Sequence, residues 1–498
     1  MNYKSLLVAL TFAFGLSAAV PDIQLVEAAK RKDTAAVRLL LQQKADVNAA
    51  TPDGATALHW AAELDDIATA ATLIDKGANA NAANVHGATA LFLACTNGSA
   101  PMIALLLKAG ANPKSPSVEG ETLLMTAART GSREAVKLLL TNGAEVNRKE
   151  SWRGQTALMW AAAEGHVSVV ELLIEFGADM RLRSEGGFTP LLFAVREGQA
   201  EAVRTLLKAG ADVNESLPAR NRRRAGSSTT EPASVKAGSS ALHLAVANAH
   251  FELAAILLDA GANPNSDGPG WTPLHTMTWI RKPGTGSNDP APTGSGTMDS
   301  LTLVRKLVAK GANLNARMTV RSNAGLSSLN TIGSTPFLMA ARCADAEYMR
   351  LLAAVGADPL LANDDQTTPL IVAAGVGTRS PGEDAGTENE VMEAVKAALD
   401  LGNDINAADS KGETVMHGAA YKHLPGVVLL LAEKGARVDA WNRKNKLGWT
   451  PLRIAEGVHR TGNFRLSPPT AAAFRQVMSA AGVSTELEAV SPDSNKVR

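Results

Sequence analysis

The sequence repeats one pattern at intervals of 33 or 34 residues wherever it is uninterrupted, and this period limits the possible folds more than any other feature. Residues 187–214 show one unit clearly: its first leucine and its closing glycine both recur along the chain. A period of this length indicates many copies of one small structural unit. The leucine position is filled by Leu25, Leu58, Leu91, Leu124, Leu158, Leu191, Leu242, Leu274, Phe337, Leu370, Met416 and Leu452, and the glycine position by Gly77, Gly110, Gly143, Gly177, Gly210, Gly261, Gly311, Gly356, Gly402, Gly435 and Gly482.

Within residues 187–214 the pattern predicts two short helices. Thr189 can cap a helix through its hydroxyl group, and Pro190 suits the first helical position. Apolar residues at helical spacing follow over residues 191–195, and Gly198 ends this helix. A second helix runs to Gly210, which can adopt the left-handed conformation that closes many helices. The unit is therefore a helical hairpin.

Each predicted helix has only about two or three turns, so one hairpin alone cannot bury enough apolar surface to offset the entropy of ordering it. The copies must stack on one another. With 498 residues and 45% apolar content the chain has ample core material, but a repeat array spreads that material along one dimension. We therefore expect an all-α solenoid that forms a single elongated domain.

The repeated unit resembles the ankyrin repeat, a 33-residue unit with a TPLHxA signature at its first helix. The chain has TALHWAA from Thr56, TPLHTM from Thr272 and ALHLAV from Ala241, and most second helices are followed by GAN or GAD. The resemblance covers nearly all of residues 22–482. It implies about twelve stacked helix-turn-helix units with β-hairpin fingers, in an elongated, curved array whose first helices and fingers line a concave groove.

The rest of the chain is organised around these repeats. Residues 1–19 combine Lys4, an apolar run and the small residues Ser17 to Ala19, which is typical of a secretory signal peptide cleaved after Ala19. A permanent anchor is the alternative, but the run is short for a bilayer, so we expect an exported protein with no integral membrane span, periplasmic if the cell is bacterial. The predicted segments are the signal peptide (1–19), an N-terminal capping unit (22–52), regular repeats (53–214), a basic Ser/Thr-rich insert (215–236), repeats with loop insertions (237–482) and a disordered tail (483–498).

Loops lengthen in the second half of the chain. The count from the leucine to the closing glycine is 19 residues in regular units but 37, 32 and 30 in the units of Leu274, Leu370 and Leu452, which places insertions between the two helices of these units. Two further insertions, before Leu242 and Phe337, enlarge fingers. Their composition predicts mobile segments, although long loops are also where function is often found. The helix–helix insertions occur in alternate units, so they could touch one another.

Composition and motifs argue against several kinds of partner and chemistry. Basic and acidic residues balance at 49 each and aromatic content is 4%, so we expect no nucleic-acid partner. Cys95 and Cys343 lie in distant units and are expected to be free thiols, with Cys95 buried and Cys343 facing the groove. Motifs of metalloproteases, serine hydrolases and phosphate-binding loops do not occur, and carboxylate pairs such as Asp364 and Asp365 fall at turns. We therefore expect no catalysis, no metal and no cofactor.

Six of the nine histidines have a structural explanation in the resemblance, while His86, His423 and His459 are scattered. His59, His243, His275 and His417 occupy the TPLH position, whose imidazole hydrogen-bonds within and between fingers in ankyrin repeats. His166 and His250 fall in turns between helices.

Aromatic and basic residues near the implied groove are the candidate contacts of a partner, because tryptophan, tyrosine and arginine are enriched at binding hot spots. Trp271 and Trp449 follow glycines at finger tips, and we predict that they contact the partner, while Trp152 and Trp441 pack on neighbouring fingers. The other candidates are Trp60 and Trp160 on first helices, and Tyr421, Arg129 and Arg196 just past the small residues of first helices.

We therefore expect a monomeric binding protein for another protein or an extended peptide. The alternative is an enzyme, or an enzyme subunit, with a pocket built by the insertions of the second half.

Overall fold

A computed structural model describes residues 21–115, 120–218, 236–283, 292–321, 328–379, 381–382, 384–457 and 466–486. These residues form helices joined by turns and loops, with no strand among them. The helices of the first part of the chain are α1 (Pro21–Lys30), α2 (Thr34–Gln42), α3 (Ala57–Glu63), α4 (Ile67–Asp75), α5 (Ala90–Thr96), α6 (Ala100–Lys108), α7 (Leu123–Thr130), α8 (Arg133–Thr141), α9 (Ala157–Glu164), α10 (Val167–Glu175), α11 (Pro190–Arg196) and α12 (Ala200–Lys208).

The helices of the second part follow the same alternation, with longer loops and one short extra helix, α23. They are α13 (Ala241–Ala247), α14 (Phe251–Asp259), α15 (Pro273–Arg281), α16 (Ser300–Ala309), α17 (Pro336–Arg342), α18 (Ala346–Ala354), α19 (Pro369–Ala373), α20 (Glu388–Asp400), α21 (Val415–Lys422), α22 (Pro425–Glu433), α23 (Val438–Trp441), α24 (Pro451–Ala455) and α25 (Pro468–Ala480). The all-helical repeat fold predicted from the sequence is confirmed. The number of ankyrin repeats and the β-hairpin fingers stay predictions.

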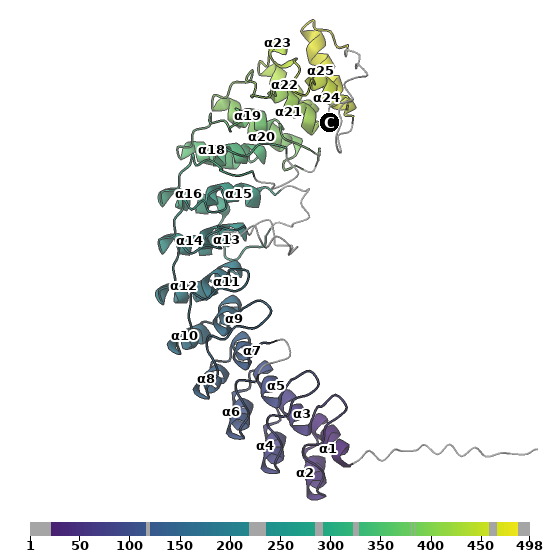
Figure 1. Ribbon diagram of the computed structural model, residues 1–498. Coiled ribbons are helices and arrows are strands. Elements are labelled where there is room, and N and C mark those ends of the chain that lie inside the picture. The colour runs from purple at the N-terminus through teal and green to yellow at the C-terminus, as the bar shows by residue number, and fades with distance from the viewer. Residues whose placement is uncertain are drawn as a thin grey trace, which may run out of the picture. The chain divides into compact units, whose positions relative to one another are not determined.

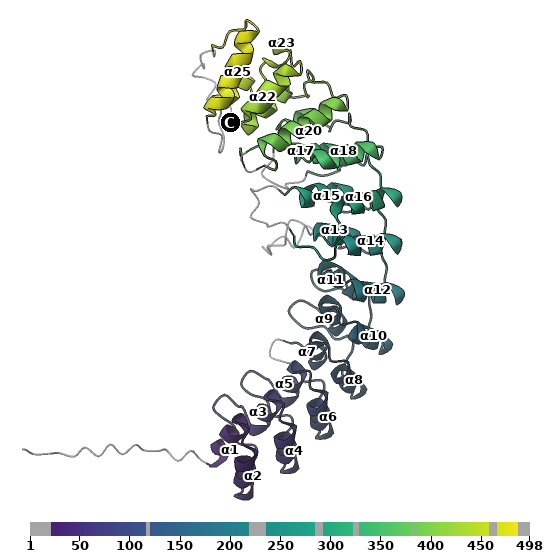
Figure 2. The same ribbon diagram turned by 180° about the vertical axis from the view of Figure 1, so that it is seen from behind.

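The chain divides into two compact units. The first consists of Met1–Ala194 with Glu201–Ala209, and the second of Val195–Ala200 with Gly210–Arg498. Within the first unit, α3, α5, α7 and α9 pack in one row and α4, α6, α8 and α10 in a second (Figures 1 and 2). The leucines of the repeat lie between the rows: Leu58, Leu91 and Leu124 are each 1% exposed. The core is therefore a continuous layer along each unit, which agrees with the expectation for a repeat array.

Helix ends follow the sequence signals. The Thr89 hydroxyl accepts a hydrogen bond from the Phe92 N–H (3.2 Å), and Thr335 caps α17 in the same way through the Leu338 N–H. The closing glycines have positive φ, as at Gly210 with 97°, a region that side chains with a Cβ rarely adopt. Four loops between pairs close on single antiparallel bridges, one of them between Ala50 and Thr56.

Buried histidines fasten successive pairs together. In His275, Nδ1 accepts from the Thr272 N–H (3.2 Å), so the proton is on Nε2, which donates to the Ser334 carbonyl of the next loop (3.1 Å). Burial lowers the pKa of this imidazole to about 4, which keeps it neutral. The structural role predicted for the TPLH histidines is confirmed, because the equivalent Nε2 contacts are His59 to Ala88, His243 to Trp271 and His417 to Trp449.

Asparagines form a second ladder between pairs. The Asn81 side chain donates to the Gly110 carbonyl (2.9 Å) and accepts from the Asn112 N–H (2.8 Å). Asn265 bonds Gly311 and Asn313 in the same way. The segment that follows the second helix reads GAN or GAD in most units, and its glycine carbonyl and the N–H two residues further on bond the preceding asparagine.

Parts of the insertions are ordered against neighbouring pairs, contrary to the mobility expected from their composition. The Ser295 N–H donates to His250 Nδ1 (3.0 Å), and the Thr297 N–H donates to the Glu252 carboxylate (3.1 Å). Gly294 permits this approach, because a Cβ there would lie 1.9 Å from the Ala249 oxygen. The glycine-rich composition therefore reflects close backbone packing in this segment.

The predictions for the signal peptide, the basic insert and the two cysteines have different outcomes. The signal peptide and most of the basic insert lie outside the described residues. Within the described ranges, no helix is both long and apolar enough to cross a bilayer. Cys95 and Cys343 are both free thiols, as predicted. However, Cys343 is 2% exposed and burial raises its pKa, so the prediction that it faces the groove is wrong.

Candidate functional site

Two candidate tryptophans of the first unit carry a cation over their rings. The Lys30 ammonium lies 4.7 Å from the Trp60 ring centroid, and the Arg129 guanidinium lies 5.2 Å from that of Trp160. Each cation comes from the end of the preceding first helix, because α1 packs on α3 and α7 packs on α9. Both indoles are half-buried and Arg129 is exposed, so these side chains reach the surface on the row of first helices.

Trp152 and Arg196, two further residues considered in the sequence, differ in exposure. Trp152 is 71% exposed with Arg153 stacked on it at 4.2 Å, which contradicts the prediction that it packs on a neighbouring finger. Arg196 is half-buried and pairs with Glu197 at 2.7 Å.

Trp271 was predicted to be exposed at a finger tip, but the structure buries it. It is 6% exposed and lies in a core cluster with Met318, Leu329 and Leu338, with Trp279 packed edge-on at 5.3 Å between ring centroids. Met318 and Leu329, from the described parts of the loop between α16 and α17, are two of these neighbours, so the indole is covered. The prediction of an exposed, partner-contacting Trp271 is therefore wrong. Trp441 packs on Phe474 and is 1% exposed, as predicted.

Trp449 and Tyr421 do come together, in a pocket of about 480 Å³ in the second unit. This volume is within the range of small-molecule and side-chain sites. Four loops, the helix–helix insertion after α19, and helix α21 line it. Its residues are Ser328, Leu329, Asn330, Asp365, Thr367, Val376, Gly377, Thr378, Arg379, Asp409, Lys411, Glu413, Tyr421, Lys446, Leu447 and Trp449.

Two insertions meet to build one wall of this pocket. The Ser328 N–H, from the finger insertion, donates to the Gly377 carbonyl of the helix–helix insertion (2.8 Å). The segment around Val376 passes directly over Gly418 in α21. A Cβ at Gly418 would lie 2.9 Å from the Val376 nitrogen, and Trp60 and Trp160 occupy the equivalent position of other first helices. Gly418 therefore makes room for the wall.

Glu413 is a buried carboxyl of this pocket, with 7% exposure. Its Oε1 accepts from the Tyr421 hydroxyl (3.1 Å) and from the Asn445 amide (2.8 Å). Its Oε2 is buried and has no hydrogen-bond partner among the described residues. Burial is the main cause that raises the pKa of Glu413 to about 7, while the hydrogen bond from Tyr421 opposes the shift. Tyr421 is itself 7% exposed, so it forms part of the pocket floor rather than an open groove surface.

The other acids of the pocket are satisfied. Asp409 accepts from the Thr367 hydroxyl (2.9 Å) and from the N–H groups of Lys411 and Glu413 (2.8 and 2.9 Å). Asp365 pairs with the Lys411 ammonium at 2.6 Å. These bonds fix the loops that surround Glu413.

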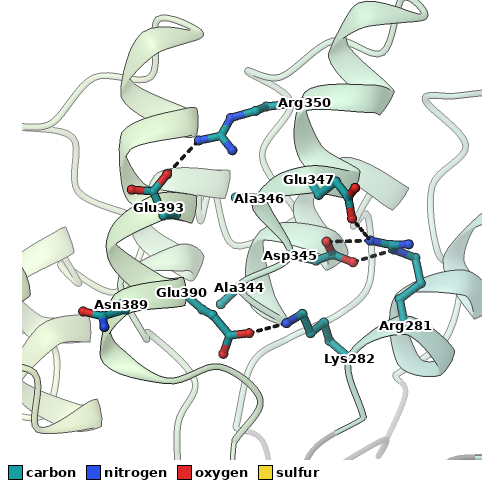
Figure 3. Close-up of a pocket in the computed structure, with 10 residues that line it drawn as sticks. All are labelled: Arg281, Lys282, Ala344, Asp345, Ala346, Glu347, Arg350, Asn389, Glu390 and Glu393. Carbon is teal, nitrogen blue, oxygen red and sulfur yellow. Dashed lines mark hydrogen bonds and ion pairs between the residues drawn. The ribbon is translucent and has the colours of Figure 1, made fainter.

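A second pocket, of about 320 Å³, lies between α15, α18 and α20 and is lined by charges (Figure 3). Arg281 forms a two-pronged bond to Asp345 (2.7 and 3.1 Å) and also reaches Glu347 (2.9 Å). Lys282 pairs with Glu390, which lowers the pKa of that carboxyl to about 2. Because these charges already bind one another, we interpret them as a structural ion-pair cluster that joins the end of α15 to α18 and α20. Lys282, at the start of the insertion after α15, thus bonds Glu390 in the first turn of α20.

Sequence reasoning found two residues of the Glu413 pocket and missed its chemistry. The composition of the insertions predicted mobile segments, yet Leu329 and Val376 form walls of this pocket. The available signals were Glu413 immediately before a capping threonine, where Ala55 and Ala88 stand in other units, and Gly418 in place of a tryptophan.

Comparison with known proteins agrees with this architecture. The family model described as "Ankyrin repeats (3 copies)" matches residues 25–117, 77–150 and 124–216, and the single "Ankyrin repeat" model matches residues 237–268. The chain belongs to the ankyrin repeat family. Among solved structures, the human ASB11 ankyrin repeat domain is similar at 30% sequence identity, over 48% of this chain and 98% of that chain, with a TM-score of 0.41. Ankyrin repeats are interaction modules, so a protein partner is the expected kind of ligand.

Proposed function

We propose that this ankyrin repeat protein is an exported, non-catalytic scaffold that binds another protein or an extended peptide through its first helices and loops. The single observation that carries the proposal is the set of half-buried tryptophans stacked with cations, Trp60 with Lys30 and Trp160 with Arg129. Tryptophan and arginine are the side chains that dominate binding energy at protein interfaces. Trp152, which is 71% exposed, extends this surface.

The proposal treats the helical pairs beyond residue 268 as further ankyrin repeats, about twelve in all, with loops that act as fingers. Support comes from the histidine contacts at His275 and His417 and from the asparagine contact at Asn265, which repeat those of the first unit. A scaffold of this kind presents many loops from one repeated frame, so that partner specificity depends on loop residues.

Export is proposed from the first 19 residues alone. Their short positive region, apolar run and small residues suit a signal peptide cleaved after Ala19, and a periplasmic location follows if the cell is bacterial. The mature protein would then meet its partner outside the cytoplasm, as a monomer, and without nucleic acid.

The proposal is tested by capturing partners with the mature protein from the exported fraction of its own cell, then titrating each purified partner. Trp160→Ala should weaken binding by about 2 kcal/mol, because a hot-spot indole is lost. The matched control is Phe176→Ala, an aromatic side chain that is 40% exposed at the end of α10 in the other row of helices, and it should change affinity less than about twofold. Equal losses for both variants, or none for Trp60, Trp152 and Trp160 variants, would contradict the proposal.

A second candidate is favoured by one specific observation, the pocket built by insertions around Glu413. The pocket supplies the enclosed site that the alternative reading required. Its buried groups suit a binding site.

A further inference from the structure

Within the part of the chain that the structure describes, only one of the two carboxyl oxygens of Glu413 has hydrogen-bond partners. Glu413 Oε1 receives two hydrogen bonds, whereas Oε2 is buried with no donor among the described residues. Buried polar atoms are nearly always paired, so an exception in a well-formed pocket calls for an explanation. Removing a carboxylate from water without a partner is costly, and a bound donor would remove that cost.

We propose that this pocket binds a positively charged nitrogen, an ammonium or guanidinium group, presented by a lysine or arginine side chain of the bound polypeptide. Such a group donates to Glu413 Oε2 and neutralises the carboxylate in the same step. The inference rests on the proposed function, because it names the chemistry of the partner at one place on the scaffold. It adds a defined subsite to a binding surface that is otherwise broad.

The walls of the pocket suit a long side chain with a charged end. Leu329, Val376, Leu447 and Trp449 provide apolar surface, and Leu447 is 62% exposed at the outer part of the wall. Lysine and arginine side chains lay their aliphatic stems on such surface while the charged end reaches a polar partner. The Trp449 ring adds a face that attracts cations.

The charges that face Glu413 from each surrounding segment also favour a cation at depth. From its own loop come Asp409, which is 7% exposed, and Lys411, whose ammonium is already bound by Asp365. From α21 comes the Tyr421 hydroxyl, and from the following loop the Asn445 amide; both are neutral and both bond Oε1. The buried part of the pocket therefore holds two carboxyl groups and no buried cation among its lining residues.

Two further cations, Arg379 and Lys446, line the pocket but are exposed. Solvent and salt screen charges at such positions, so they oppose an entering cation only weakly. They favour a partner whose basic side chain is flanked by acidic residues.

Binding of a cation should be linked to loss of a proton. Because the pKa of Glu413 is raised to about 7, a large fraction of the group is protonated at neutral pH in the free protein. A bound cation stabilises the charged form, so the proton passes to the buffer when the complex forms. Affinity should therefore rise as the pH increases through 7.

The test is calorimetric titration of the mature protein with N-acetyl-arginine methylamide, with N-acetyl-citrulline methylamide as a neutral control of the same shape. At pH 8 we expect the arginine probe to bind at least tenfold more tightly than the citrulline probe. At pH 7 its binding should release a fraction of a proton, which is measured from the heat of binding in buffers of different ionisation enthalpy. Glu413→Gln should lower arginine affinity at least tenfold and abolish proton release.

Three results would overturn the inference: equal affinity for arginine and citrulline, arginine binding that survives Glu413→Gln, or no binding of either probe by the wild-type protein. The first and third need no variant, so they stand even if Glu413→Gln fails to fold. Agmatine, a guanidinium without a peptide backbone, identifies the source. Tighter binding of the blocked amino acid supports a partner side chain, whereas binding of agmatine alone overturns it in favour of a free amine. Partner capture that depends on Trp160 while arginine binding fails would leave the proposed function standing.

Discussion

The two units use the same frame of histidine and asparagine contacts but place their aromatic side chains differently. In the first unit, Trp60 and Trp160 are half-buried under cations and Trp152 is exposed. In the second, Trp271 and Trp441 are core residues. The difference follows from the loops: short loops leave the first-helix row open, whereas insertions in the second unit cover Trp271 and enclose a pocket. The loops around an indole therefore decide whether it is surface or core.

Acidification should separate the two units most strongly. Burial lowers the pKa of His243, His275 and His417 to about 4, against an ordinary value of 6.5. Their neutral forms stabilise the fold above pH 6.5, and this stability is lost as the pH falls from 6.5 through 4, on the order of 3 kcal/mol for each imidazole. All three lie in the second unit, whereas the first has one histidine at this repeat position, His59, whose pKa burial also lowers, so the second unit should open first.

One group in the same unit acts in the opposite sense but does not cancel this loss. The pKa of Glu413 is raised to about 7 from 4.5, so its contribution is fully present below pH 4.5 and is lost as the pH rises through 7. The two buried thiols report on the units separately, with Cys95 in the first and Cys343 in the second. Labelling with a disulfide reagent that reacts at acidic pH should accelerate at Cys343 before Cys95. A faster rise at Cys95 would contradict the assignment.

The next largest effect should come from Trp271. Trp271→Ala should cost about 3 to 5 kcal/mol of unfolding free energy, because it removes a large buried side chain from a packed cluster. The matched control is Trp152→Ala, which should stay within about 0.5 kcal/mol since its indole is exposed. Denaturant unfolding measures both. Similar losses for the two variants would remove the distinction between the units.

A smaller effect should distinguish buried from exposed ion pairs within the second unit. Arg281→Ala should cost about 3 kcal/mol, because Asp345 is left with an unpaired buried charge. Arg350→Ala breaks the pair with Glu393, in which both side chains are about half exposed, and should cost less than about 1 kcal/mol. Urea unfolding of the two variants compares them directly. A loss of unfolding free energy for Arg350→Ala as large as that for Arg281→Ala would show that burial does not determine how much these ion pairs stabilise the fold.

Much of the frame could be predicted from the sequence, since period, caps and glycines are local signals. Thr89, Gly210 and His275 all do what their repeat positions indicate. The exposure of individual tryptophans could not, because it depends on how insertions fold back. Gly270 before Trp271 resembles a finger tip in sequence, and only the packing of the indole with Met318 and Leu329, both distant in sequence, shows that it is covered.

In the candidate site, too, some residues could be predicted from the sequence and others could not. Tyr421 and Trp449 were found because they are aromatic residues at variable repeat positions. Glu413 was missed because a glutamate near a turn is usually solvated, and its burial is produced by Asn445 and by the segment over Gly418, both distant in sequence.

The most direct test of the contrast between the units is oxidative footprinting of all seven tryptophans in the native protein, read by mass spectrometry. We predict fastest oxidation at Trp152, intermediate rates at Trp60, Trp160, Trp279 and Trp449, and protection of Trp271 and Trp441 until the protein unfolds. Oxidation of Trp271 as fast as that of Trp152 in the folded protein would contradict the account, because it would return that indole to the surface.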